Sequence, residues 1–325
     1  MTHNGTLTIA EALEAHLDND KHIMLAFYAL WIIGSTVLLP ILIIISLHMH
    51  LRPAAMINMC IVFSLTGILD SMLFYGRLLF PRSDLAAICT MQAALVFPAT
   101  VACAAAHACL MYEVYTRVRD FAGVPTRLAG HLSLRQTIII LVPYIAFCAF
   151  AIPGLVVALE MYSSLPYDNP TSISLRREFY CSVPHGTYSM SAGVVTALFL
   201  IPPFVYKVQI VKVIWKEWPL FRTSVVGLSN LRYAVRMIVL CSYLGAAVAL
   251  GILSVLQPEN PGPDIFFAST AVFIALVFAT GREAWTTFIS ILRRCLCLGP
   301  RDGGSADDEF HCTQSSQVSE ASPPV

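Results

Sequence analysis

Residues 23–47 read IMLAFYALWIIGSTVLLPILIIISL, which contains no charged side chain. A helix needs about 20 apolar residues to cross roughly 30 Å of hydrocarbon, so this stretch predicts a membrane-spanning helix. Six more stretches of similar length and hydrophobic character follow, at residues 54–79, 86–115, 137–159, 187–214, 233–256 and 264–281. The sequence therefore predicts an all-α membrane protein, a bundle of seven transmembrane helices whose two termini lie on opposite sides of the membrane.

The composition excludes an ordinary soluble protein. Of the 325 residues, 57% are hydrophobic and only 12% are charged, whereas about a quarter are charged in a typical globular domain. The formal net charge is zero, so no overall electrostatic field favours nucleic acid as a partner. The predicted partner over most of the chain is the lipid bilayer.

Basic residues indicate the orientation, because Lys and Arg are retained in loops on the cytoplasmic side. Of the 20 Lys and Arg residues, 15 fall in alternate loops, in the adjoining inner ends of the apolar stretches, or in the C-terminal segment. The N-terminus is therefore predicted to lie outside and the C-terminus in the cytosol. On this scheme residues 1–22 form an extracellular segment and residues 23–281 the seven-helix transmembrane bundle. Residues 282–298 form a juxtamembrane amphipathic helix, and residues 299–325 form a disordered cytosolic tail.

The predicted topology sorts the ten cysteines. Most lie inside apolar stretches or in the cytosol, where thiols stay reduced. Only Cys89 and Cys181 lie on the oxidising side, Cys89 at the outer end of the third stretch and Cys181 in the loop before the fifth. A disulfide between them would tie that loop across the mouth of the bundle. The alternative is two free thiols at apolar boundaries.

Polar side chains inside the apolar stretches are candidates for a functional site, because an ionisable group in hydrocarbon costs about 2.5–3.5 kcal/mol. Asp70 is the clearest case, with the aromatic Tyr75 close by in the sequence, and Asn58 and His107 are less costly polar residues. Asp70 is expected either to line a ligand or ion cavity, or to join helices as a protonated or hydrogen-bonded acid.

Charged and aromatic residues gather at the predicted cytosolic face. Glu113 and Arg117 are four residues apart with the acid first, the favourable order for an ion pair on a helix. They represent either a receptor-like switch or an interfacial pair that reaches to the headgroups. Further members of this face are Lys212, Trp215, Lys216, Arg232 and Arg236. Such a mixture is typical of a basic and aromatic belt at the inner leaflet, and it is also a candidate docking surface for a cytosolic partner.

Two kinds of modification are predicted near the termini. Asn4-Gly5-Thr6 is a glycosylation acceptor on the side predicted to be extracellular. Cys295 and Cys297 are candidate palmitoylation sites beside the predicted juxtamembrane helix.

No pattern of catalysis or cofactor binding is found in the sequence. It has no hexapeptide nucleotide loop, no paired metal-binding histidines and no Ser, His and Asp set at catalytic spacing. We therefore predict no enzyme, no catalytic residue, no metal and no cofactor. All the lysines precede the seventh stretch, so a retinal Schiff base on that helix is also excluded.

The layout of seven spans, an outer N-terminus and two outer cysteines resembles that of G-protein-coupled receptors. Four short motifs are similar to those of the orphan seven-transmembrane, receptor-like proteins common in mushroom-forming (basidiomycete) fungi. They are Cys89-Thr90-Met91-Gln92-Ala93, Tyr180-Cys181, Trp215-Lys216-Glu217-Trp218 and Phe278-Ala279-Thr280-Gly281-Arg282-Glu283. The resemblance covers about residues 22–292.

This resemblance implies a multi-pass receptor of the plasma membrane that senses an unknown extracellular ligand and signals to a heterotrimeric G protein. The chain departs from rhodopsin-like receptors in lacking the Asp-Arg-Tyr, Cys-Trp-x-Pro and Asn-Pro-x-x-Tyr motifs at the expected places. The switch residues of those receptors therefore have no counterparts to carry over. The alternative function is that of a membrane transporter or a non-signalling membrane scaffold.

Overall fold

The computed structural model describes residues 22–48, 54–79, 85–123, 132–163, 175–176, 180–181, 186–223, 225–256 and 262–279. Almost all of these residues are helical, which confirms the predicted helical class. The exception is a short antiparallel ribbon, in which β1 (Leu175–Arg176) pairs with β2 (Tyr180–Cys181). This ribbon was not predicted from the sequence.

The helices coincide with the apolar stretches to within a few residues, although several extend beyond them. The first helix begins at His22 and continues as the π-helix η1 (Ile32–Leu38) and α2 (Leu39–His48). Next come α3 (Ala54–Asp70), α4 (Met72–Leu79), α5 (Leu85–Phe121) and α6 (Leu132–Ser163). After the ribbon follow α7 (Thr187–Lys216), α8 (Trp218–Thr223), α9 (Val225–Leu256), α10 (Gly262–Ala268) and α11 (Thr270–Ala279).

Five helical segments are long and apolar enough to cross a membrane. They are His22–Leu47, Ala87–Phe121, Leu134–Glu160, Thr187–Lys216 and Leu231–Leu250. The helical segments Ala54–Asp70 and Gly262–Phe278 are apolar but shorter. The structure thus supports a membrane-embedded helical protein, while the count of seven spans stays a prediction.

Helix α5 is the central helix of the bundle. It packs against α3, α6, α7 and α9. In its most apolar 18-residue stretch, 72% is buried, whereas the corresponding shares are 22% for α6 and 17% for α7. The outward side chains of α6 and α7 are large and apolar, such as Ile152 and Phe204, each 68% exposed. We infer that α6 and α7 face lipid and that α5 organises the interior.

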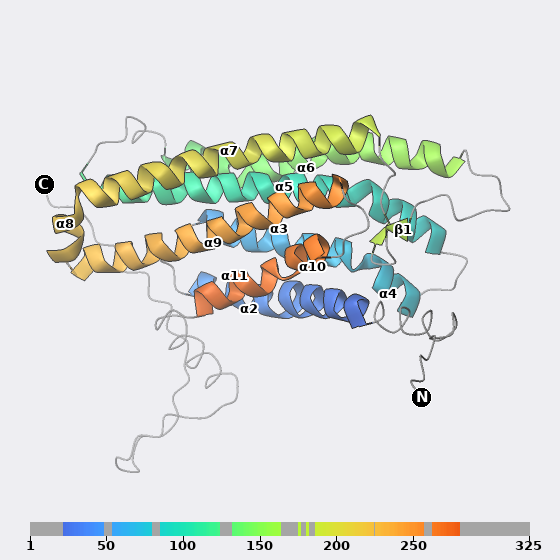
Figure 1. Cartoon of the computed structure of the whole chain (residues 1–325), viewed down its shortest axis with the longest axis horizontal. Helices are drawn as coiled ribbons and strands as arrows, with labels where there is room; N and C mark the ends of the chain where they lie inside the picture. Colours follow the sequence, from blue (N-terminus) through green and yellow to red (C-terminus); the bar gives the residue numbers. More distant parts are fainter. Residues whose placement is uncertain are drawn as a thin grey trace, which may run out of the picture. The chain divides into compact units, whose positions relative to one another are not determined.

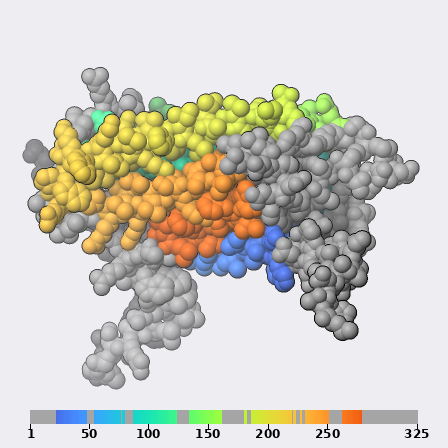
Figure 2. All heavy atoms as spheres, in the orientation of Figure 1, coloured from blue at the N-terminus to red at the C-terminus, as the bar shows by residue number. Residues whose placement is uncertain are grey.

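The long helices run alongside one another (Figure 1), so the bundle has two ends. We call the end that carries β2 the ribbon end, and the opposite end the α8 end. On the face shown in Figure 2, α7, α9 and α11 are all visible, and α9 contacts both of the others.

The first helix widens before a proline. Pro40 has no N–H to donate, and its ring crowds the carbonyl group four residues earlier. The preceding residues form η1, which closes with a bond from the Leu39 N–H to the carbonyl of Gly34, five residues back. A π-helical turn relieves the crowding without ending the helix, and it places Gly34 and Ser35 in the interior.

Two glycines allow close helix contacts at this widened turn. A Cβ added to Gly34 would lie 2.7 Å from the Cβ of Ala271 in α11, and one added to Gly67 would lie 2.6 Å from Cε3 of Trp31. Small residues let helix backbones approach closely inside membranes. The first helix therefore packs tightly against both α3 and α11.

We expect Gly67→Ala to lower the thermal unfolding midpoint of the detergent-solubilised protein, because over-packing a close contact costs about 1–3 kcal/mol. Gly193→Ala is the matched control, since nothing lies within 4 Å of a Cβ added in that position of α7. Size-exclusion chromatography after heating measures the unfolding midpoints of both variants. Equal midpoints for the two variants would contradict the close contact.

Candidate functional site

At the ribbon end, a disulfide joins Cys89 of α5 to Cys181 of β2 across 92 residues of sequence, with a Cα–Cα distance of 5.2 Å. Cys181 is completely buried. The pairing of these two cysteines is the one predicted from the sequence. The bond fastens the ribbon to the central helix.

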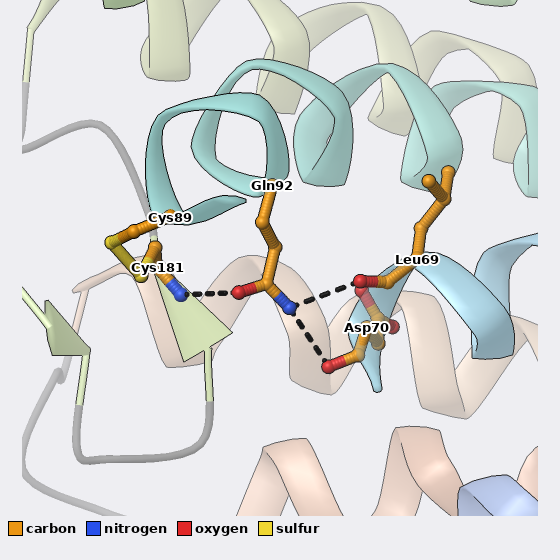
Figure 3. The surroundings of a disulfide bond; sticks show 5 residues. All are labelled: Leu69, Asp70, Cys89, Gln92 and Cys181. Carbon is orange, nitrogen blue, oxygen red and sulfur yellow. Dashed lines mark hydrogen bonds between the residues drawn. A yellow bond between two sulfur atoms is a disulfide. The ribbon is translucent and has the colours of Figure 1, made fainter. Parts of the chain in front are cut away.

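Gln92, one turn after Cys89, reinforces this attachment (Figure 3). Its Oε1 accepts a hydrogen bond from the Cys181 N–H at 3.0 Å, and its Nε2 donates to the carbonyl groups of Leu69 at 3.0 Å and Asp70 at 2.9 Å. Those two carbonyl groups lie at the C-terminus of α3, where helical carbonyls lack partners within the helix. A single buried amide thus connects the ribbon, α5 and the junction of α3 and α4.

Tyr180, beside the disulfide, connects the ribbon to two more helices. Its hydroxyl donates to Oδ1 of Asp264 in α10 at 3.2 Å. Its ring stacks on Phe27 of the first helix with a centroid distance of 6.3 Å. The ribbon is therefore held by α5, α10 and the first helix together.

Asp70 lies beneath this ribbon and is 5% exposed. No described residue hydrogen-bonds to its Oδ1, and its link to α5 runs through the main-chain carbonyl instead. Tyr75 is half-buried and makes an edge-on ring contact with Phe74, at a centroid distance of 5.8 Å.

Asn58 lies far from Asp70 and has a structural role. Its Nδ2 donates to the Ile140 carbonyl at 3.0 Å, and its Oδ1 accepts from the Tyr144 hydroxyl at 2.7 Å. Both bonds join α3 to α6. Twelve residues of helix separate Asn58 from Asp70, or ~18 Å along the axis, so these two predicted site residues do not form one site.

His107, on α5, is separate from both Asp70 and Asn58 in the sequence. It is 1% exposed, and neither ring nitrogen has a hydrogen-bond partner among the described residues. Lys207 of α7 is another polar residue of the interior helices, and its Nζ donates to Ser242 Oγ of α9 at 3.4 Å.

At the α8 end, Glu113 makes two contacts. Its Oε1 forms the predicted ion pair with Arg117 at 3.0 Å, and its Oε2 accepts from the Ala55 N–H at 3.0 Å. Ala55 lies in the first turn of α3, where backbone N–H groups need an acceptor outside the helix. The side chain of Glu113 is 16% exposed and that of Arg117 is 49% exposed. The buried cap is therefore the more consequential contact.

Arg135 of α6 also binds α5 at this end. It donates to the hydroxyl of Thr116 and lies over the ring of Tyr112, 4.9 Å from the centroid. Together with the cap at Ala55, this contact connects the beginnings of α3 and α6 to the last turns of α5.

The predicted basic and aromatic belt lies on the surface near α8. Lys212, Lys216 and Arg232 are exposed, Arg236 is half-buried and Trp215 is 84% exposed. These exposures suit both an interfacial belt and a docking surface.

Several predicted features fall outside the described residues. They are the acceptor Asn4, the cysteines Cys295 and Cys297, the juxtamembrane helix at residues 282–298 and the tail at residues 299–325. Within the described ranges, no three His, Cys, Asp or Glu side chains gather as metal ligands.

The chain matches no family model in a scan of protein families and no curated protein in a sequence search. The resemblance to fungal receptor-like proteins thus stays a prediction that rests on the motifs quoted above.

Four residues of these contacts were not predicted from the sequence as site residues: Gln92, Tyr180, Asp264 and Lys207. Gln92 and Tyr180 each stand next to a noted cysteine, but nothing in the sequence gave the direction of their side chains. Asp264 is the first residue of the last apolar stretch, so the sequence indicates only a residue at the boundary of that stretch.

We expect Gln92→Leu to destabilise the protein strongly, because it leaves two carbonyl groups and one N–H without their partner, at about 1–3 kcal/mol for each unsatisfied buried group. Gln136→Leu on α6 is the matched control, since Gln136 is exposed. Thermal midpoints in detergent measure the difference. A Gln92→Leu variant as stable as Gln136→Leu would refute the bridging role.

For the α8 end we expect Glu113→Ala to cost more stability than Arg117→Ala. The first change removes the acceptor of the Ala55 N–H, whereas the second breaks a half-exposed ion pair worth about 0–1 kcal/mol. Glu113→Gln should fall close to Arg117→Ala, because the amide oxygen still accepts from Ala55. Denaturation midpoints rank the three variants, and an equal loss for Glu113→Ala and Glu113→Gln would contradict the cap.

Proposed function

We propose that the protein is a seven-transmembrane receptor of the plasma membrane, similar in layout to G-protein-coupled receptors. In this proposal the N-terminus and the ribbon end face outward, and a ligand binds near Asp70. The α8 end faces the cytosol and acts on a heterotrimeric G protein. The two short pairs, α3 with α4 and α10 with α11, complete the seven spans.

The observation that carries the proposal is that α3 and α5 connect the two ends of the bundle. At the ribbon end, Gln92 of α5 binds the C-terminus of α3. At the α8 end, Glu113 of α5 binds the first turn of α3. A displacement of the ribbon by a ligand therefore acts on the same pair of helices that shape the opposite end.

The middle of these helices supports a receptor over a transporter. Between Gln92 and His107, the fully buried side chains of α5 are small and apolar, mostly alanines. On α3, the buried residues between Asn58 and Asp70 are apolar apart from Thr66, whose hydroxyl bonds within α3 and contacts Cys103. A packed apolar layer suits movement of rigid helices between two states better than a polar path for a solute.

The test is nucleotide exchange by candidate Gα subunits, each combined with the purified protein in proteoliposomes, with and without extracellular extracts. We expect at least one subunit to exchange faster with the protein present, and an active extract to change that rate. Asp70→Asn should weaken the response to the extract, because it removes a buried carboxyl group from the proposed ligand site. Asp120→Asn, at the α8 end, should leave the extract concentration for half-maximal response unchanged.

The receptor proposal fails if no subunit responds while the same proteoliposomes take up solute, which would favour the transporter. It also fails if the proteoliposomes do neither, which would favour a scaffold.

A further inference from the structure

A cationic side chain lies at the seam between α7 and α9. The Lys207 Nζ lies 3.4 Å from the Ser242 Oγ and 3.9 Å from the position of a Cβ added to Gly245. The Ser242 hydroxyl itself donates to the Ile238 carbonyl within α9 at 2.8 Å. Its oxygen therefore remains available as an acceptor for the ammonium group, which is placed against α9.

This ammonium group lies deep within the apolar part of α7. Trp215 is 84% exposed near the end of the helix, and tryptophan marks the membrane interface. Lys207 precedes it by eight residues, or ~12 Å of helix, in a hydrocarbon core that is about 30 Å thick. The group is thus close to the middle of the membrane.

The side chain does not extend back toward the nearer interface. Helix α9 runs from the α8 end to the ribbon end, so Gly245 is farther than Ser242 from the α8 end. Nζ lies beside both residues, a direction that fits the tilt of helical side chains toward the N-terminus of their own helix. Lys207 therefore does not place its charge among the headgroups, as a snorkelling lysine would.

The described residues give this charge no counter-ion. Their ion pairs at the α8 end join Arg117 to Glu113 and Lys216 to Glu217, and no described carboxylate lies within ion-pair distance of Lys207. A charged side chain in hydrocarbon normally pairs with another group or faces a polar cavity. One bound anion would therefore neutralise the charge of Lys207 at this site.

The surroundings of the seam are apolar. Phe204, Val208 and Val239 are 68%, 42% and 49% exposed, and α7 and α9 are in contact (Figure 2). A ligand that reaches this depth from the bilayer must itself be lipophilic. Phospholipid headgroups remain at the interface, ~12 Å away along the helix.

We propose that Lys207, positioned by its hydrogen bond to Ser242, binds the carboxylate of a free long-chain fatty acid that enters from the bilayer. The acyl chain lies along the exposed apolar side chains of α7 and α9. The ion pair neutralises Lys207, and the alkyl chain stays in hydrocarbon. This site is separate from the ligand site near Asp70 and does not depend on coupling to a G protein.

The experiment uses the full chain in phosphatidylcholine nanodiscs with a palmitic acid analogue that carries a diazirine in its chain. We expect photolabelling of α7 and α9 peptides that oleic acid competes away and methyl oleate does not, because the ester lacks the charge. Lys207→Met should weaken labelling by about tenfold or more, which corresponds to one decade in affinity. Lys207→Arg should retain most of it.

Lys212→Met is the matched control, because Lys212 is an exposed lysine on the same helix and should leave labelling unchanged. Equal competition by the acid and the ester would overturn the proposal, and so would full labelling of Lys207→Met or no labelling of α7 and α9. If Lys207→Met fails to fold, as judged by its elution profile, two measurements still decide. They are the acid-against-ester comparison on the unaltered protein and the weaker labelling expected for Ser242→Ala.

Discussion

The buried amide of Gln92 is the interaction on which the ribbon end depends. It uses one oxygen and one nitrogen to satisfy three main-chain groups from two distant segments. The disulfide one turn away holds β2 at the distance that these hydrogen bonds require. Without the amide, the C-terminus of α3 would have two carbonyl groups facing a dry interior, where an unsatisfied polar group is expensive. The position of Asp70 beneath the ribbon follows from this arrangement.

The same logic applies along the whole of α5. Its polar side chains at the two ends, Gln92 and Glu113, each complete an end of α3, while the buried alanines and Cys103 between them allow neighbouring helices to approach closely. Small residues at a helix interface promote packing in a membrane, where the hydrophobic effect does not drive helices together. Polar groups therefore set the register of the bundle at its ends, and close packing holds its middle.

The helical class and the positions of the helices could be predicted from hydropathy, because each crossing must satisfy its backbone within itself. The pairing of Cys89 with Cys181 followed from topology, since the other cysteines lie where disulfides do not form. The partners of Gln92 and Lys207 could not be predicted, because they depend on how each helix is rotated about its own axis. In a helix that is apolar on all sides, no pattern of polar residues indicates that rotation. The predicted group of Asp70, Asn58 and His107 is divided among separate regions for the same reason.

The first helix illustrates what the sequence can and cannot supply. Pro40 predicts an irregularity in the helix, but the helix accommodates the proline with a π-helical turn at Ile32–Leu38 rather than a break. That turn places Gly34 against Ala271 of α11, a contact between segments far apart in the chain. Local chemistry located the irregularity, whereas packing determined its form.

Peptide mapping under non-reducing conditions, on protein taken from native membranes with free thiols blocked first, tests the central arrangement most directly. We predict that the peptide containing Cys89 is linked to the peptide containing Cys181 and that they separate on reduction. Recovery of both cysteines in blocked form would contradict the attachment of the ribbon to α5, and with it the position assigned to Asp70.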